Sequence, residues 1–253
     1  MIESKEVALF IEENIDKEFH AKKEDKIKKL KLIDITKRKN PYLFKAKGMM
    51  SAGELIKSIM DATVSSGEET IFGNFMEIVA IHTCNRALGG RKSSAVGIDL
   101  EFELDGKKYL VSIKSGPNWG NSSQIKKMKD SFNKAKKVLG TSGGINSTSI
   151  VCIEGCCYGY DANPEKGTHI KLCGQDFWTL ISGGNFSLYK DIIEPIGKIA
   201  KVRNDSLLEI TNAKLNKFTA EFIEEYCDKN GAIDWDLLVS GNSGSRSNYF
   251  QES

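Results

Sequence analysis

The chain has 253 residues, enough for one large domain or for a core with a smaller helical addition. Hydrophobic residues make up 40% of it and charged residues 28%, with a formal net charge of +2, which is ordinary for a globular protein. No apolar run approaches the roughly 20 residues of a membrane helix. The acidic start MIESKEVALFIEEN does not match a signal peptide. We therefore expect a cytoplasmic protein without a membrane partner.

The six cysteines favour reduced thiols over a disulfide framework, because Cys156 and Cys157 are adjacent within an apolar run. A zinc site is the alternative, built from His169 with Cys173, or from Cys152 with the adjacent pair. These spacings fit no zinc finger or ribbon, and a strand would point Cys156 and Cys157 to opposite faces. Lysine-rich segments at 22–31, 126–137 and 107–114 indicate either a polyanion partner or solvated helix faces.

The N-terminal quarter is predicted to be helical. Apolar residues at helical spacing predict one or two helices over 4–34, and Asn40-Pro41 interrupts the pattern. Ser51 followed by Glu54 is typical of a capping box, which opens a helix extending to about Val64. A separate helix is predicted from about Glu69 to Leu88, where Gly89-Gly90 ends it.

The middle of the chain is predicted to hold a β-hairpin. Residues 98–104 and 107–114 alternate polar and apolar, and Asp105-Gly106 between them is a strong type I′ turn signal. A Gly-rich loop follows, and Ser122 or Ser123 would cap a helix reaching Leu139. The remaining expectations are a loop at 141–148, a buried strand within 149–159, a short strand at 171–173, helices at 175–182, 186–202 and 206–229, and a mobile tail from 241 to 253. This order predicts a mixed α/β domain with a helical N-terminal region.

A two-residue turn fixes which residues of the hairpin face each other. Residue numbers of cross-strand partners then sum to 211, so Asp99 lies opposite Ser112 and Lys114 is its diagonal neighbour on the same face. Glu101 and Glu103 lie further along that face. The bland interpretation is a solvated surface with an ion pair worth about 0–1 kcal/mol. The opposite face is apolar and should pack on helices through Leu100, Phe102, Tyr109, Val111 and Ile113.

An acid and a lysine on adjacent strands are what metal-dependent phosphodiester cleavage requires. The carboxylate holds a hard divalent ion such as Mg²⁺, and the lysine orients or deprotonates the attacking water and stabilises the transition state. The nuclease motif PD…(D/E)xK has this arrangement. Asp99 and Lys114 match it, whereas Ile98 replaces the proline and Ser112 replaces the second acid.

Four segments together resemble the PmeII-type type II restriction endonucleases of the PD-(D/E)xK superfamily, which are similar to enzymes that cut interrupted GC-rich palindromes. They are NPYLFKAKG (40–48), SSGEETIFGNFMEIVA (65–80), GGRKSS…GIDLEF (89–102) and SIKSGPNWGNSSQ (112–124). The resemblance covers about 38–200. It implies a restriction-endonuclease-like core at 65–203, in which helices flank a central mixed sheet. A helical region at 1–64, with dimerisation or DNA clamping as candidate roles, and a C-terminal helix with a tail at 204–253 complete the expected organisation.

The resemblance also implies a homodimer that uses Mg²⁺ to cut double-stranded DNA within a restriction-modification system. Asp99 is then the metal-binding acid, Lys114 the catalytic lysine, and the Ile113 carbonyl a further metal ligand. Ser112 occupies the place of the second acid, so another carboxylate is needed. Glu77 is the first choice, and Glu101, about 6–7 Å beyond Asp99, is the alternative. A solvent-facing helix position is the other interpretation of Glu77.

The loop after the hairpin and the helix that it opens are the predicted DNA-facing surface. Trp119 would stack on DNA, or else belong to the core. Polar side chains and free backbone N–H groups at the helix start suit phosphates and base edges, and lysines add salt-sensitive attraction. The predicted DNA-binding residues are Arg91, Lys92, Asn118, Trp119, Asn121, Ser122, Ser123, Gln124, Lys126 and Lys127. Two other functions stay open: a structure-specific or repair nuclease, and a DNA-binding module whose nuclease site has decayed.

Overall fold

The structure, a computed structural model, describes residues 1–142 and 149–244. Most of the predicted loop at 141–148 and of the predicted mobile tail at 241–253 lies outside the described residues. The chain forms two compact units. The sheet unit comprises Met1–Phe19 and Ile71–Ala200, and the helical unit comprises His20–Thr70 and Lys201–Ser253. The predicted organisation into 1–64, 65–203 and 204–253 stays a prediction. Parts of its first and last regions share the helical unit, whereas Met1–Phe19 belongs to the sheet unit.

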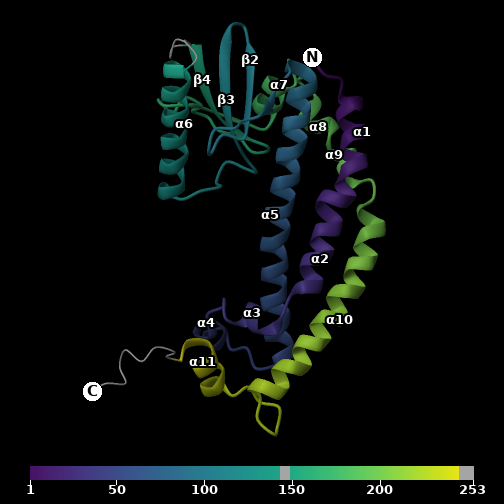
Figure 1. Ribbon diagram of the computed structural model, residues 1–253. Coiled ribbons are helices and arrows are strands. Elements are labelled where there is room, and N and C mark those ends of the chain that lie inside the picture. The colour runs from purple at the N-terminus through teal and green to yellow at the C-terminus, as the bar shows by residue number, and fades with distance from the viewer. Residues whose placement is uncertain (143–148, 245–253) are drawn as a thin grey trace, which may run out of the picture. The chain divides into compact units, whose positions relative to one another are not determined.

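A five-stranded sheet organises the sheet unit (Figure 1). Its order is β1-β2-β3-β4-β5, and the strands are β1 (Arg91–Lys92), β2 (Leu100–Leu104), β3 (Lys107–Lys114), β4 (Ile150–Cys156) and β5 (Ile170–Cys173). The first three strands pair antiparallel, whereas β4 is parallel to β3 and β5 is parallel to β4. The parallel step from β3 to β4 is made through α6 (Ser122–Ser142). The predicted mixed sheet flanked by helices is confirmed.

Helices cover both faces of this sheet. On one face, Leu110 and Ile150 pack against Met128 and Phe132 of α6. On the other face, the apolar side of the hairpin packs against α5 (Ala52–Leu88), α7 (Gln175–Ile181) and α1 (Ser4–Ile15). On the hairpin face that carries the acids, α6 covers Leu110, and polar residues lie on both sides of it, Ser112 and Lys114 toward one end and Lys108 and Glu103 toward the turn.

Three short helical segments complete the sheet unit. The π-helix η1 (Asp16–His20) continues α1 up to the boundary between the units. The helix predicted at 186–202 is instead α8 (Leu188–Asp191) followed by α9 (Ile193–Gly197). Pro195 lies within α9, where its ring fixes φ at a helical value but leaves no N–H to donate.

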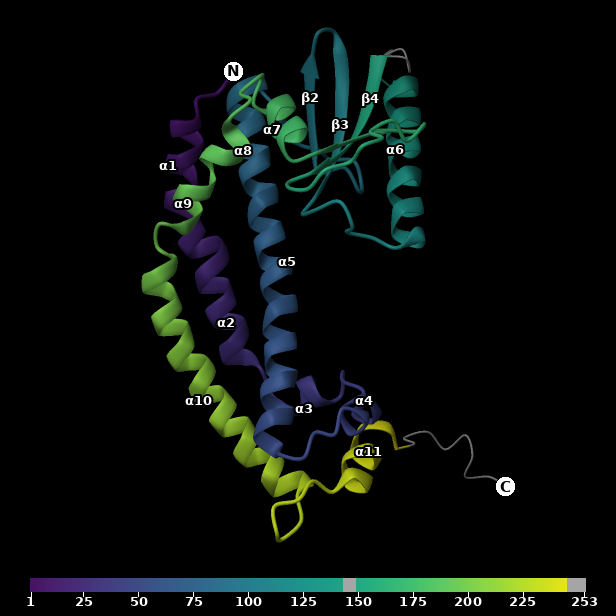
Figure 2. The same cartoon turned by 180° about the vertical axis from the view of Figure 1, so that it is seen from behind.

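The helical unit has a separate apolar core (Figure 2). It contains α2 (Ala21–Lys29), α3 (Leu32–Thr36), α4 (Pro41–Ala46), α10 (Ala200–Tyr226), α11 (Trp235–Ser243) and the first part of α5. Leu55, Ile56 and Phe222 are fully buried in that core. The sequence did not predict α11, although Asp234 caps it by accepting a hydrogen bond from the Leu237 N–H at 2.9 Å.

The helices predicted at 52–64 and 69–88 are one continuous helix, α5, so the predicted break is wrong. The weak helix formers Ser65, Ser66 and Gly67 favoured a break, but contacts within the helical unit override them. Gly67 is buried against the Lys26 side chain, where a Cβ atom would come within 2.9 Å of Nζ. The helix begins as expected, with the Ser51 hydroxyl accepting from the Glu54 N–H at 3.1 Å, and ends before Gly89 at a φ of 68°.

The hairpin folds in the predicted register. Leu104 pairs with Lys107 and Leu100 with Val111, and both turn residues have positive φ, 50° at Asp105 and 71° at Gly106. These angles match the type I′ turn that the Asp-Gly pair predicts. Among the described residues, no helix combines the length and the apolarity needed to cross a membrane.

Candidate active site

Asp99 lies directly before β2 and is held against the end of β3. Its Oδ2 atom accepts hydrogen bonds from the Ile113 N–H at 2.7 Å and from the Ser112 hydroxyl at 3.4 Å, while its own N–H donates to the Val111 carbonyl at 2.9 Å. The side chain is 25% exposed. Within the described part of the chain, Oδ1 accepts no hydrogen bond. The turn-derived register thus fixes this carboxylate and leaves one oxygen open to a ligand.

Lys114 ends β3 beside Asp99. Its Nζ atom lies 3.8 Å from Asp99 Oδ2 and donates a hydrogen bond to the Ile113 carbonyl at 3.0 Å. The Trp119 ring lies over the same ammonium, with 4.8 Å between Nζ and the ring centroid. The predicted juxtaposition of Asp99, Ser112 and Lys114 is present in the structure. The Ile113 carbonyl faces this cluster, because Lys114 reaches it from there.

Glu77 on α5 is electrostatically coupled to this cluster. Burial raises the pKa of Glu77, the Asp99 charge raises it further, and the nearby charges of Lys92 and Lys114 oppose the rise without cancelling it. Lys92 Nζ lies 3.8 Å from the Glu77 carboxylate, whose side chain is 28% exposed. A bound cation would relieve the repulsion that the Asp99 charge exerts on the Glu77 carboxylate.

Glu101, the alternative second acid, has three partners. Its carboxylate accepts from Arg91 Nε at 2.8 Å, the Ser93 hydroxyl at 3.0 Å and Lys108 Nζ at 3.4 Å. Burial alone would raise the pKa of Glu101, but these hydrogen bonds and the Lys108 charge lower it below its ordinary value. Glu101 is thus fully engaged by protein donors, whereas Glu77 interacts with the Asp99 charge.

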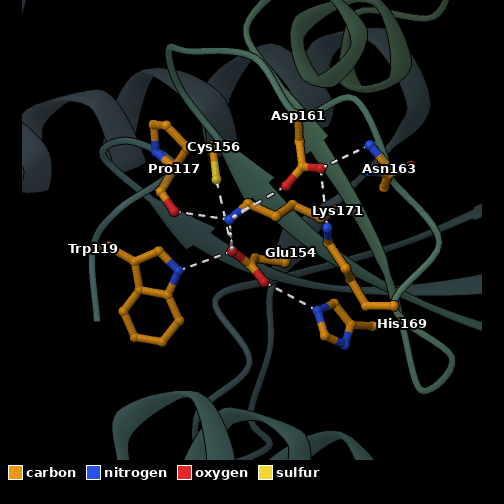
Figure 3. Close-up of polar contacts among 9 residues, drawn as sticks. Pro117, Trp119, Glu154, Cys156, Asp161, Asn163, His169 and Lys171 are labelled. Carbon is orange, nitrogen blue, oxygen red and sulfur yellow. Dashed lines mark hydrogen bonds and ion pairs between the residues drawn. The ribbon is translucent and has the colours of Figure 1, made fainter. Parts of the chain in front are cut away.

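The strand beside Ser112 carries a carboxylate that sequence reasoning missed. In the parallel register, Ser112 pairs with Glu154 on β4, so Asp99 and Glu154 flank the serine on either side. The Glu154 carboxylate is almost fully buried and accepts hydrogen bonds from Trp119 Nε1 at 2.9 Å and Lys171 Nζ at 3.1 Å, and it bonds His169 Nε2 at 3.0 Å (Figure 3). An acid inside an otherwise apolar strand was the only available signal.

A comparison with models of protein families identifies the chain. Residues 5–204 match the model described as type II restriction endonuclease EcoO109I. The chain belongs to this family. A comparison with curated proteins gives no match. The resemblance to type II restriction endonucleases is therefore confirmed at the level of the class, and the protein is an enzyme that hydrolyses double-stranded DNA at specific sites.

The predicted DNA-facing residues beyond Lys114 lie in a partly buried loop and at the exposed start of α6. Asn118, Lys126 and Lys127 are exposed, as is the segment 121–124. The cap of α6 differs from the prediction: Asn121, not Ser122 or Ser123, closes it. Asn121 Oδ1 accepts from the Gln124 N–H at 3.0 Å, and Gln124 Oε1 accepts from the Asn121 N–H at 2.9 Å, so both amides already serve in a reciprocal cap.

Arg91 and Lys92 form β1 at the edge of the sheet, with side chains 72% and 74% exposed. Arg91 pairs with Glu101 at 2.7 Å, and Lys92 is the residue that faces Glu77. Of the predicted DNA-binding residues, these two thus lie beside the two candidate second acids, Glu101 and Glu77. Their predicted contact with DNA stays a prediction.

The cysteines are all free thiols, and five of the six are buried. Burial raises the pKa of Cys84 and of Cys157 to about 12, so these thiols stay protonated at neutral pH. His169, considered above with Cys173 as a zinc ligand, bonds Glu154 through Nε2 and the Thr168 hydroxyl through Nδ1. In residues 1–142 and 149–244, no three His, Cys, Asp or Glu side chains cluster as a metal site.

Proposed function

We propose that this protein is a Mg²⁺-dependent PD-(D/E)xK nuclease in which Asp99, Lys114 and Glu77 carry the cleavage of DNA. The observation that supports this most is the end of the hairpin. Asp99 Oδ2 lies 3.8 Å from Lys114 Nζ, and the Asp99 charge raises the pKa of Glu77 on the facing helix. Two partly exposed carboxylates and one lysine that interact electrostatically support this assignment, as do the exposed lysines at the start of α6.

The donor set fits Mg²⁺ better than a softer metal. Mg²⁺ binds oxygen ligands, commonly one or two carboxylates with the rest of its shell made of waters and substrate phosphate oxygens. Asp99, Glu77 and the Ile113 carbonyl offer three such oxygens. Five of the six cysteine thiols, which would favour zinc, are buried, and the His169 imidazole is bonded to Glu154. When bound, the ion would neutralise charge on the scissile phosphate and acidify the attacking water.

The reaction is hydrolysis of a phosphodiester. The water oxygen forms a bond to phosphorus, the bond to the leaving ester oxygen breaks, and that oxygen takes up a proton. Lys114 holds the attacking water in line and donates hydrogen bonds to the negative charge that builds up on the phosphate. Ser112 keeps Asp99 in place through its hydroxyl, so it serves as a positioning residue in this scheme.

Binding of DNA is assigned to the surface around this site. Arg91 and Lys92 at the sheet edge, together with Lys126 and Lys127 on α6, would attract phosphates in a salt-dependent way. Backbone N–H groups at Ser122 and Ser123 would bind a phosphate at the helix start. Asn118 would contact the DNA from the loop, and Asn121 and Gln124 would do so with the amide atoms that the cap leaves over.

The finer assignment is a homodimer of PmeII-type specificity, acting in a restriction-modification system. Two copies related by a twofold axis present two active sites to the two strands of a palindrome, so each subunit cuts one strand. The proposed target is a short palindromic or pseudopalindromic site. Dimerisation or DNA clamping is assigned to the helical region at 1–64.

The test is digestion of a supercoiled plasmid and of a long linear DNA with and without Mg²⁺. Discrete limit fragments that require Mg²⁺ would support the assignment, and sequencing of their ends gives the recognition site. Wild-type cleavage by Asp99→Ala or Lys114→Ala would overturn the proposed site. Preference for branched substrates would favour a repair nuclease, and intact plasmid with retained binding would favour a decayed module. Glu103→Gln, 75% exposed on the same strand, is the matched control.

A further inference from the structure

The loop that follows the catalytic strand is anchored at four successive points. The Ser115–Asn121 segment leaves β3 directly after Lys114. The Lys114 carbonyl accepts from the Cys157 N–H at 2.9 Å, and the Ser115 carbonyl accepts from the Tyr158 N–H at 3.2 Å. Further on, the Pro117 carbonyl accepts from Lys171 Nζ at 2.8 Å. The last anchor is the hydrogen bond from the Trp119 indole to Glu154.

Glu154 and Lys171 supply the two outer anchors and are paired with each other. Figure 3 shows Glu154 between the indole of Trp119, the ammonium of Lys171 and the imidazole of His169. Exposed fractions of the side chains are 5% for Glu154 and 12% for Lys171. Burial would raise the pKa of Glu154, but the hydrogen bonds from His169, Trp119 and Lys171 lower it to about 2. The carboxylate is therefore ionised and immobile.

The indole that Glu154 holds also touches the catalytic lysine. One edge of Trp119 donates Nε1–H to Glu154 Oε1 at 2.9 Å, and the face of the same ring lies 4.8 Å from Lys114 Nζ. A cation over an indole face is attracted by the ring quadrupole. The ring also borders a cavity of about 140 Å³, so it has room to turn once the bond to Glu154 is lost.

We propose that Glu154 is a positioning residue for the cleavage reaction: it fixes the Trp119 ring, which in turn fixes the Lys114 ammonium beside Asp99. This inference rests on the proposed function, since it assumes that Lys114 acts in catalysis. Two other roles compete with it. Glu154 would be a metal ligand in place of the acid missing at Ser112, or Trp119 would serve to stack on DNA.

The geometry distinguishes these roles. Both oxygens of Glu154 are occupied by protein donors, and the side chain is nearly sealed from solvent, so a cation would have to displace Lys171 or His169. Trp119 is bonded at its edge and covered on one face by Lys114, which leaves it less of its surface for a base. An aromatic ring that touches a cation with its face and a carboxylate with its edge fixes where the cation lies. It does not change the charge of the cation.

The experiment measures single-turnover cleavage of a plasmid at saturating enzyme and Mg²⁺, and DNA affinity separately with Ca²⁺ in place of Mg²⁺. Glu154→Gln and Trp119→Phe each disturb the hydrogen bond between the Trp119 indole and Glu154, and Trp119→Leu removes the aromatic ring. We expect the rate constant to fall about 3- to 10-fold for the first two variants and more than 10-fold for Trp119→Leu, with a DNA dissociation constant within twofold of wild type.

Non-additivity is the signature that a merely structural role would not produce. In the Trp119→Leu background, Glu154→Gln should have no further effect on the rate, because its action passes through the ring. Asp161→Asn is the matched control. Asp161 lies 3.8 Å from Lys171 in the same network but does not contact the ring, so its cleavage rate should equal that of wild type.

Three outcomes would overturn the inference. An unchanged rate in Glu154→Gln and Trp119→Leu removes it directly. A higher Mg²⁺ requirement in Glu154→Gln makes Glu154 a metal ligand, and a weakened DNA affinity with a normal rate makes Trp119 a DNA contact. Should Glu154→Gln not fold, Trp119→Phe and Trp119→Leu carry the test, since Trp119 is only partly buried and packs against the edge of the core. Wild-type cleavage by Lys114→Met would instead refute the proposed function.

Discussion

Asp99 and Glu154 flank the same serine on neighbouring strands, yet their surroundings are opposite. Asp99 is 25% exposed, has an oxygen without a hydrogen bond from the described residues, and shares its site with a second carboxylate, Glu77. Glu154 is 5% exposed and bonds three partners that hold its pKa at about 2. Two carboxylates that lack a full set of partners repel each other, and a bound cation relieves that repulsion. A carboxylate whose oxygens all accept bonds from protein donors instead stabilises the fold. Whether an acidic side chain of this protein is suited to bind a cation therefore depends on its hydrogen-bond and ion-pair partners, and not on its distance from the PD-(D/E)xK motif.

The largest expected effect is on the cleavage rate and concerns Asp99, the carboxylate with incomplete partners. Asp99→Asn keeps the shape and the hydrogen bond to the Ile113 N–H but removes the charge that a metal needs. We expect a loss of about 10³-fold or more in single-turnover cleavage, about 4 kcal/mol on the barrier. DNA affinity in Ca²⁺ should remain within a few-fold. Cleavage within tenfold of wild type, with Glu103→Gln equally active, would remove Asp99 from the active site.

Substitution of Glu154, the carboxylate with a full set of partners, should lower the stability of the fold. Glu154→Ala leaves Lys171, His169 and the Trp119 indole without their acceptor in a buried place, so we expect the free energy of unfolding to fall by about 3–5 kcal/mol at pH 7. Urea denaturation measures this. The pKa of Glu154 lies below its ordinary value of 4.5, so its stabilisation is complete above about pH 4.5 and is lost as pH falls toward 2. A variant with unchanged stability would contradict the scaffold role.

Glu101 tests an intermediate case on the same face. It is paired with Arg91, Ser93 and Lys108, but Arg91 is largely exposed. Glu101→Gln should lower the free energy of unfolding by about 1–2 kcal/mol and leave the Mg²⁺ requirement of cleavage unchanged. Denaturation and a Mg²⁺ titration check the two parts. A Mg²⁺ requirement raised tenfold would move Glu101 into the metal site.

The smallest expected effect is an increase in the free energy of unfolding, caused by a substitution of Glu77. The pKa of Glu77 is raised, so ionised Glu77 opposes folding once the pH exceeds that pKa, and its favourable contribution is complete only below 4.5. Without metal at pH 7, Glu77→Gln should therefore raise the free energy of unfolding by up to about 1 kcal/mol, or the melting temperature by about 2–4 °C. The gain should disappear at pH 4. A destabilised variant would mean that Glu77 has a structural partner.

The strand pairing of Asp99 could be predicted from the sequence, whereas that of Glu154 could not, for a physical reason. A two-residue turn fixes the register of an antiparallel hairpin locally, so the pairing of Asp99 with Ser112 follows from Asp105-Gly106. The parallel pairing of Ser112 with Glu154 spans α6 and has no such turn. Its register depends on how α6 packs on the sheet, which local patterns do not encode.

The same distinction explains the helices. The Ser51 cap and the Gly89 terminus of α5 are local signals, and both were predicted. The continuity of α5 through Ser65–Ser66–Gly67 depends on a residue from another helix, Lys26, which lies against Gly67. The union of His20–Thr70 with Lys201–Ser253 in one unit is likewise a long-range property.

The central claim is that Glu77 and Asp99 together supply the acids of this nuclease although position 112 is a serine. The most direct measurement is the Mg²⁺ dependence of single-turnover cleavage for wild type, Glu77→Gln and Glu101→Gln side by side. The account predicts that Glu77→Gln raises the Mg²⁺ concentration at half-maximal rate at least tenfold and lowers the maximal rate, while Glu101→Gln matches wild type in Mg²⁺ dependence. A normal Mg²⁺ dependence in Glu77→Gln, with the shift in Glu101→Gln instead, would contradict it.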